Sequence, residues 1–211
     1  MATLSSYITE VRRLLHDANG NFYSDSELTD YINNARNRLV RDTGVLRSLQ
    51  SSSIATNAET LAFSSLPQGT KTLDVININL YWGNTRVPLR YLAWTDFNAQ
   101  LRYWQNYTGR PVAFSMYGQQ TIYFGPVPDQ TYQLDVDTVI MPTDLVTGDE
   151  VDNIPDPYTS PVAYYAAYKA KFKEQSYGES QIFKQEYQRQ VQAVLNSVFT
   201  RRMPNVYQMN Y

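Results

Sequence analysis

The chain has 211 residues and a mass of 24.3 kDa, which fits one domain or one domain with an insertion. Hydrophobic residues make up 43% of it, enough for a core, but charged residues make up only 18%, below the roughly 25% usual for soluble proteins. The absence of cysteine excludes a disulfide framework and a thiolate zinc site. No segment has the pattern of a signal peptide or a membrane span, so we expect a soluble protein that is made in a cytoplasm.

Charge is distributed unevenly, although the net charge is only −2. Residues 1–48 hold six basic and six acidic side chains, residues 49–157 hold five and eleven, and residues 158–211 hold seven and three. The acidic middle argues against tight nucleic-acid binding there, because phosphate contacts supply most of such affinity. Tyr occurs 18 times, often on polar stretches. Some of these rings complete the core, but Tyr is favoured at protein interfaces, and we expect many to serve there.

The N-terminal segment predicts two helices. Four apolar residues at helical spacing mark the first: Leu4, Ile8, Val11 and Leu15. Ser24 and Glu27 have capping-box spacing at the start of the second helix, and Gly44 ends it. The apolar stripe of this helix comprises Leu28, Tyr31, Ile32, Ala35 and Leu39. Three arginines are expected largely outside the stripe: Arg36, Arg38 and Arg41.

From about Gln50 the hydrophobic period becomes alternating, which predicts strands. Residues 76–82 alternate with Trp82 on the apolar side, and Gly83-Asn84 is a hairpin signal from which residues 85–89 return. A short helix is expected over residues 95–104. Further strands are expected over residues 112–117, 121–124 and 131–140. This series predicts a small antiparallel sheet or sandwich.

Two helices follow a proline-interrupted loop at residues 142–157. Ser160 is expected to cap the first, with Pro161 at its first position, and Gly178 to separate it from the last. Apolar residues at helical spacing mark the first of them: Val162, Tyr165, Ala166 and Phe172. The last helix has a longer stripe: Phe183, Tyr187, Val191, Val194, Leu195 and Val198.

Neither pair of helices can bury its stripe alone, so we expect the two ends of the chain to pack as one bundle. The predicted fold is therefore α+β. Residues 1–49 and 158–200 form the helical bundle, residues 50–157 form an inserted antiparallel β-sheet or sandwich, and residues 201–211 form an extended C-terminal arm.

Three groups of polar residues are candidates for chemistry, and each has a simpler interpretation. His16 beside Asp17 resembles an oriented base, but a His at a helix C-terminus also favours the helix dipole. Asp135 and Asp137, about 7 Å apart on one strand face, match a glycosidase pair, although alternating Asp usually marks a solvated face. Acidic residues in the loop lack calcium-loop spacing, which favours a solvated loop: Asp144, Asp149, Glu150, Asp152 and Asp156. We expect no catalytic residue, metal or cofactor.

The C-terminal segment combines two cations with apolar and aromatic residues and has few other charges. A disordered end is one interpretation, and a docking arm is the one we favour. The residues expected to dock are Arg201, Arg202, Met203, Val206, Tyr207 and Tyr211.

Three stretches of the sequence, taken in their order along the chain, resemble those of a known protein family. They are Tyr23–Leu28 followed by Tyr31–Ala35, Gly109–Pro111 through Gly125–Asp129 to Met141-Pro142, and Ile154–Tyr158 leading into Tyr164–Tyr168. In this order they resemble the head-to-tail connector proteins of tailed bacteriophages, also called adaptor or head-completion proteins.

That resemblance implies a structural virion protein at the neck. Its copies would form a ring, commonly of twelve, that binds the portal protein below the packaged head and a tail or nozzle protein on the other side. DNA would pass through the lumen with transient non-specific contact. The helical bundle would form the ring wall, the β insertion would face the tail, and the C-terminal arm would dock on the portal. Neither an enzymatic role nor a membrane is implied.

Other functions remain open from the sequence. A tail-terminator or other tail ring subunit would be more β-rich at its ends. A glycan-binding module is suggested by Trp82, Trp94 and Trp104, but it leaves the helices unexplained. A wall-degrading hydrolase would use Asp135 and Asp137.

Overall fold

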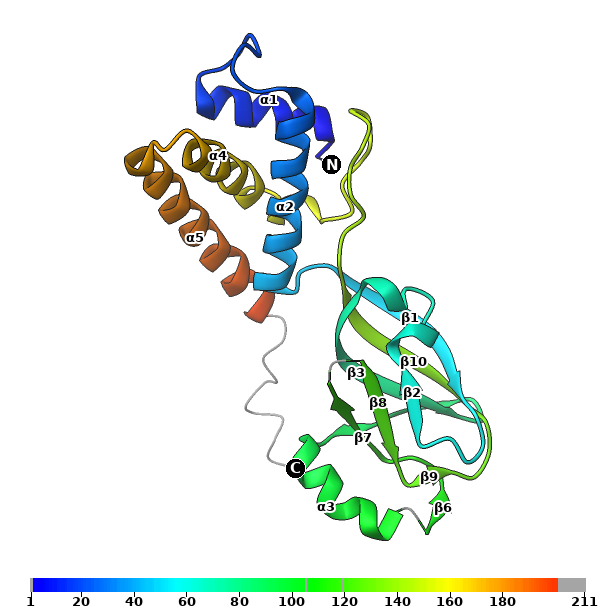
Figure 1. Cartoon of the computed structure of the whole chain (residues 1–211). Coiled ribbons are helices and arrows are strands. Elements are labelled where there is room, and N and C mark those ends of the chain that lie inside the picture. The colour runs from blue at the N-terminus through cyan, green and yellow to red at the C-terminus, as the bar shows by residue number, and fades with distance from the viewer. Residues whose placement is uncertain (1, 105, 119, 201–211) are drawn as a thin grey trace. The chain divides into compact units, whose positions relative to one another are not determined.

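The computed structural model describes residues 2–104, 106–118 and 120–200 (Figure 1). The chain divides into two compact units, which we call the helical unit (Met1–Leu46 with Met141–Tyr211) and the β unit (Arg47–Ile140). The predicted α+β fold is confirmed. The loop at residues 142–157, which the sequence grouped with the strands, clusters with the helices through its contacts.

The helical unit contains four long helices: α1 (Leu4–Leu15), α2 (Asp25–Thr43), α4 (Pro161–Lys173) and α5 (Tyr177–Thr200). A single 3₁₀ turn, Asp156–Tyr158, precedes α4. Helix α4 packs against α1, α2 and α5, so helices from both ends of the chain share one core (Figure 1). Arg36 lies inside this core and is fully buried, which contradicts its predicted place outside the stripe.

Local signals explain most of the helix ends. The Thr3 hydroxyl caps α1 in a reciprocal capping box with Ser6. At α2 the Ser24 hydroxyl accepts from the Glu27 N–H at 3.3 Å, but the Glu27 carboxylate binds other side chains, so the predicted box is only half formed. Gly44 ends α2 with φ +59°, a left-handed conformation that glycine adopts without strain.

The boundary between the last two helices differs from the prediction. Gly178 lies inside α5, and the chain turns instead at Gln175, whose φ is +63°. At the start of α4, Pro161 occupies the first turn as expected, whereas the Ser160 hydroxyl makes no capping bond. The sequence contains no local sign of the turn at Gln175, because residues other than glycine adopt a left-handed conformation only uncommonly.

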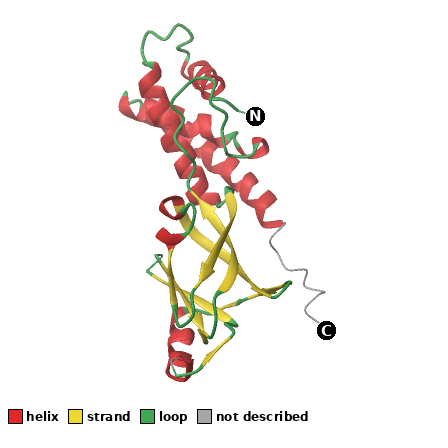
Figure 2. Ribbon diagram, turned by 90° about the vertical axis from the view of Figure 1, so that its right-hand side faces the viewer, coloured by secondary structure: helices red, strands yellow, loops and turns green. Residues whose placement is uncertain are grey.

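The β unit contains two four-stranded sheets, and Figure 2 shows its strands in yellow. The first sheet has the order β1-β10-β3-β4, with β1 (Arg47–Ile54), β10 (Tyr132–Ile140), β3 (Thr72–Trp82) and β4 (Thr85–Pro88). The second has the order β2-β8-β7-β5, with β2 (Thr60–Ala62), β8 (Thr121–Gly125), β7 (Ala113–Tyr117) and β5 (Arg90–Tyr91). Strands β6 (Thr108–Gly109) and β9 (Val127–Pro128) pair separately.

Pairing is antiparallel within both sheets except between β5 and β7, and β6 also pairs with β9 in parallel. Two 3₁₀ turns, Phe63–Ser65 and Gly69–Lys71, connect β2 to β3. The two sheets bury one shared hydrophobic cluster, which includes Ile54, Ile78, Leu80, Phe114, Phe124 and Leu134. Trp82 ends β3 and is 57% exposed, so its predicted place on the apolar side is wrong.

Helix α3 (Trp94–Trp104) packs on β7 and β8. Phe97 is fully buried at this contact, and the Trp104 ring lies over Gly125. A Cβ at position 125 would lie 2.0 Å from that ring, so only glycine allows the close approach. The sequence predicted this helix but not the helix-to-strand contact.

Candidate interaction surfaces

The predicted docking arm lies outside the described residues. It comprises Arg201, Arg202, Met203, Val206, Tyr207 and Tyr211. Its role therefore stays a prediction.

His16 and Asp17 do not form a catalytic pair. His16 is exposed at the C-cap of α1 with φ +58°. Asp17 is buried, and its carboxylate accepts from the backbone N–H groups of residues 21, 22 and 23 and from Arg12. Burial alone would raise the pKa of Asp17, but these backbone bonds and the Arg12 charge together lower it. Asp17 holds the turn between α1 and α2.

Asp135 and Asp137 are both engaged by neighbouring strands. Asp135 is 6% exposed, accepts from the Tyr81 hydroxyl at 2.8 Å and the Ser51 hydroxyl at 3.1 Å, and pairs with Arg86 at 2.7 Å. Asp137 pairs with Arg47. The predicted solvated face is therefore wrong for Asp135, because cross-strand partners from β1, β3 and β4 cover it. A glycosidase needs two carboxyl groups that are free to face a substrate, whereas Asp135 and Asp137 are each engaged by an arginine of another strand.

The loop between β10 and α4 is fixed by a buried ion pair. The Arg36 guanidinium donates to both Asp152 oxygens, at 3.0 and 2.7 Å, and Tyr7 donates to the same carboxylate at 2.6 Å. Asp152 is 5% exposed, so it is not part of a solvated loop as predicted. Burial and the adjacent carboxylate raise the pKa of Tyr7 far above its ordinary value, so Tyr7 stays a donor.

Beside this ion pair lies a groove of about 910 Å³ between α1, α2 and the loop. We call it the acidic groove, because Asp25, Asp30 and Asp144 line it and only Arg12 is basic among the described residues that line it. The Glu150 carboxylate accepts from the backbone N–H groups of residues 146 and 147, which closes a turn and leaves the Val146 side chain 76% exposed in the groove wall.

A second surface covers α4 and α5, and we call it the aromatic–lysine face. Consecutive ring centroids lie 4.9 to 6.0 Å apart in the order Tyr187, Tyr165, Tyr168, Phe172 and Tyr177. Lys169 lies 5.8 Å from the Tyr165 centroid, and Lys184 lies 6.0 Å from that of Tyr168. Phe172 and Tyr177 are 51% and 60% exposed. Exposed aromatic rings with cations held over them are typical of protein-binding surfaces.

The tryptophans of the β unit do not support a glycan platform. Trp94 packs against Tyr117 and Tyr123, each with centroids 4.8 Å away, and Trp104 packs on Phe97. Arg110 lies 4.4 Å from the centroid of the more exposed Trp82 and covers one of its faces.

The division of charge between the units corrects the sequence interpretation. Residues 47–140 hold six basic and six acidic side chains and are neutral, whereas residues 141–157 hold five acidic and no basic ones. The acidity assigned to the middle of the chain therefore belongs to the loop of the helical unit.

These features define a class of protein. The described residues, 2–104, 106–118 and 120–200, include no group of three potential metal ligands, and the candidate catalytic carboxylates are engaged in structural pairs. None of the described helices is long and apolar enough to cross a membrane. The acidic groove and the aromatic–lysine face are surfaces of the kind found on structural subunits that bind other proteins.

The sequence comparison specifies the class further. The chain belongs to the SU10 adaptor protein family, whose sequence profile matches residues 2–208. A search of curated proteins found no match. The protein is thus a structural adaptor of bacteriophages and a component of the virion.

Proposed function

We propose that this adaptor is a head-to-tail connector subunit whose copies form a ring, of twelve, between the portal and the tail. The observation that carries the proposal is the family match over residues 2–208, almost the whole chain. A second support is that the helical unit carries two chemically different surfaces, since a closed ring joins each copy to the next through two unlike patches.

Within this ring the two units have separate roles. The helical unit forms the wall, the β unit contacts the tail or nozzle protein, and residues 201–211 dock on the portal. DNA passes through the lumen with transient, non-specific contact. The neutral charge of the β unit and the net negative charge of the loop at residues 141–157 support weak contact, because tight binding to phosphates needs clustered cations.

The test is to add the purified protein to tail-less, DNA-filled heads of the same phage and image the vertex by electron cryomicroscopy. We expect a ring of density below the portal. A ring found only at the end of isolated tails would overturn the connector function and favour a tail-terminator.

The docking arm is tested by deleting residues 201–211 and comparing portal binding in the same assay. We expect the shortened chain to keep its helical circular dichroism spectrum and to lose portal binding. Portal binding equal to that of the full chain would remove the arm from the proposal and leave the connector function intact.

A further inference from the structure

We propose that neighbouring copies of this chain join through their helical units, with the aromatic–lysine face of one copy seated in the acidic groove of the next. The inference rests on the proposed ring and names the surfaces that close it. Both surfaces belong to one compact unit, so their relation follows from the packing of its helices.

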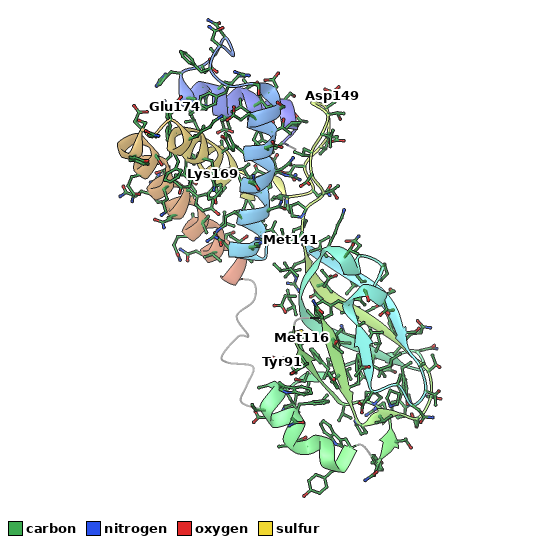
Figure 3. All side chains as sticks on the ribbon, in the orientation of Figure 1. Tyr91, Met116, Met141, Asp149, Lys169 and Glu174 are labelled. Carbon is green, nitrogen blue, oxygen red and sulfur yellow. The ribbon has the colours of Figure 1, made fainter. Side chains whose placement is uncertain are left out.

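The two surfaces lie on opposite sides of α2. Asn33 and Arg36 bind the loop that forms the groove, through the backbone of Leu145 and through Asp152. Arg38 and Asp42 line the hollow of the aromatic–lysine face. At about 100° per residue, these two pairs point in nearly opposite directions from the helix axis. Figure 3 shows Asp149 of the loop and Lys169 of α4 on either side of α2 in that view. Two different patches on opposite sides of one unit allow each copy to bind two neighbours at once in a head-to-tail manner.

The charges of the two surfaces are complementary. Asp30 and Asp144, which line the groove, and Asp149, which follows the lining residue Gly148, are exposed, and within the described part of the chain none of the three forms an ion pair. On the other surface, Lys169 and Lys184 lie over tyrosine rings and likewise form no ion pair with a described residue. Most other charged groups of the helical unit are neutralised by a partner in the same copy, as Lys173 is by Glu27 at 2.5 Å. Asp30, Asp144, Asp149, Lys169 and Lys184 are therefore available to a second copy.

Apolar contacts are also matched. The Val146 side chain is 76% exposed in the groove wall, and Phe172 and Tyr177 are more than half exposed on the other surface. The aromatic rings are already held in place by contacts with one another, so their binding in a groove costs little side-chain conformational entropy. The lysines, already placed over the rings, steer the approach toward the carboxylates.

The test uses charge reversals in the full-length protein, with rings on tail-less heads as the readout. The first variant carries Lys169→Glu with Lys184→Glu, and the second carries Asp30→Lys with Asp144→Lys. Each alone places like charges across the contact, so we expect a loss of about tenfold or more in ring-bearing vertices. An equal mixture should restore rings, because the two variants can alternate around an even-numbered ring. A chain with all four substitutions should also assemble alone.

The control is Arg41→Glu with Arg90→Glu, at exposed cations outside both surfaces, and it should assemble like the parent. Circular dichroism establishes that each variant is folded. If either single-surface variant forms rings as the parent does, or if the mixture fails to restore them, the pairing is wrong while the connector function stands. If a charge-reversal variant forms normal rings that no longer join tails, the substituted surface binds a tail protein instead of a second copy. No ring from the parent would overturn both proposals.

Discussion

At the scale of single residues, the helical unit depends on one buried arginine. Arg36 donates to both oxygens of Asp152, to the Asn33 side chain at 2.9 Å and to the Thr143 backbone carbonyl at 2.9 Å. The Asp152 carboxylate also accepts from Tyr7 and from the backbone N–H of Ile154. Such complete pairing offsets the cost of removing two charges from water, and it ties α1, α2 and the loop together.

Because the pair is buried, removing one partner leaves an uncompensated charge. We expect Arg36→Met to lower the free energy of unfolding of the helical unit by about 3–5 kcal/mol. Arg38→Met on the same helix is the control, since its pair with Asp42 is 55% and 26% exposed and should contribute only about 0–1 kcal/mol. Urea denaturation followed by circular dichroism measures both. Equal losses for the two variants would contradict the role given to Arg36.

Asp17 adds a dependence on pH. Its pKa is lowered in the folded state, so its stabilising contribution is complete above the unfolded-state pKa of about 3.9 and is lost as the pH falls through the folded-state pKa. We expect Asp17→Asn to be less stable than the parent at pH 7, with a difference that shrinks toward pH 3. Melting temperatures measured across this range test it, with Asp149→Asn at an exposed position as the control. A difference independent of pH would show that the charge of Asp17 is not involved.

At the scale of secondary-structure elements, α4 is the centre of the helical unit. It contacts three other helices, and the side chains it buries are mostly small: Pro161, Val162, Ala163, Ala166, Ala167 and Ala170. Its larger residues, such as Tyr165 and Phe172, lie toward the surface. Small side chains let helix backbones approach closely, and the rings left outside form the aromatic–lysine face.

A larger side chain on the buried side of α4 should therefore force the helices apart. We expect Ala170→Leu to destabilise the helical unit by about 1–3 kcal/mol, because overpacking displaces neighbours that have no space to move. Ala193→Leu is the matched control, since Ala193 is exposed on α5. Thermal unfolding of both variants gives the comparison. A change at position 170 as small as that at position 193 would mean that α4 is loosely packed.

Local sequence signals predicted the elements that depend on local physics. The helix end at Gly44, the hairpin at Gly83-Asn84 and the strand ending at Ile140 are confirmed. The sequence placed the start of the strands at about Gln50 but did not delimit β1, because its Ser-rich sequence alternates weakly and is held by pairing with β10, some 80 residues away. The burial of Arg36 was missed for the same reason, since its partner Asp152 is distant in sequence. Apolar spacing also placed the larger residues of α4 inside, because it cannot distinguish a helix packed on several sides from one with a single buried face.

At the scale of the whole molecule, the β unit is an insertion with adjacent ends. The chain enters it at Arg47 and leaves it at Ile140, and Arg47 pairs with Val139 across the antiparallel strands β1 and β10. Paired residues in such strands have Cα atoms only about 5 Å apart. A short linker between Leu46 and Met141 is therefore enough to connect the two parts of the helical unit.

Because the two ends of the β unit are adjacent, this unit can be removed from the chain to test whether the two units have separate roles. We expect a chain in which a short Gly/Ser linker replaces residues 47–140 to fold, because its helices keep the Arg36–Asp152 pair and the alanine contacts of α4. Residues 47–140 alone should fold as well, since they hold their own hydrophobic cluster. Under the proposed function, the chain without the β unit should still form rings on tail-less heads, but these rings should not join tails. A chain with a linker of twice the length should give the same result. Folded helices without rings would show that the wall needs the β unit, whereas rings that join tails normally would place the tail contact on the helical unit.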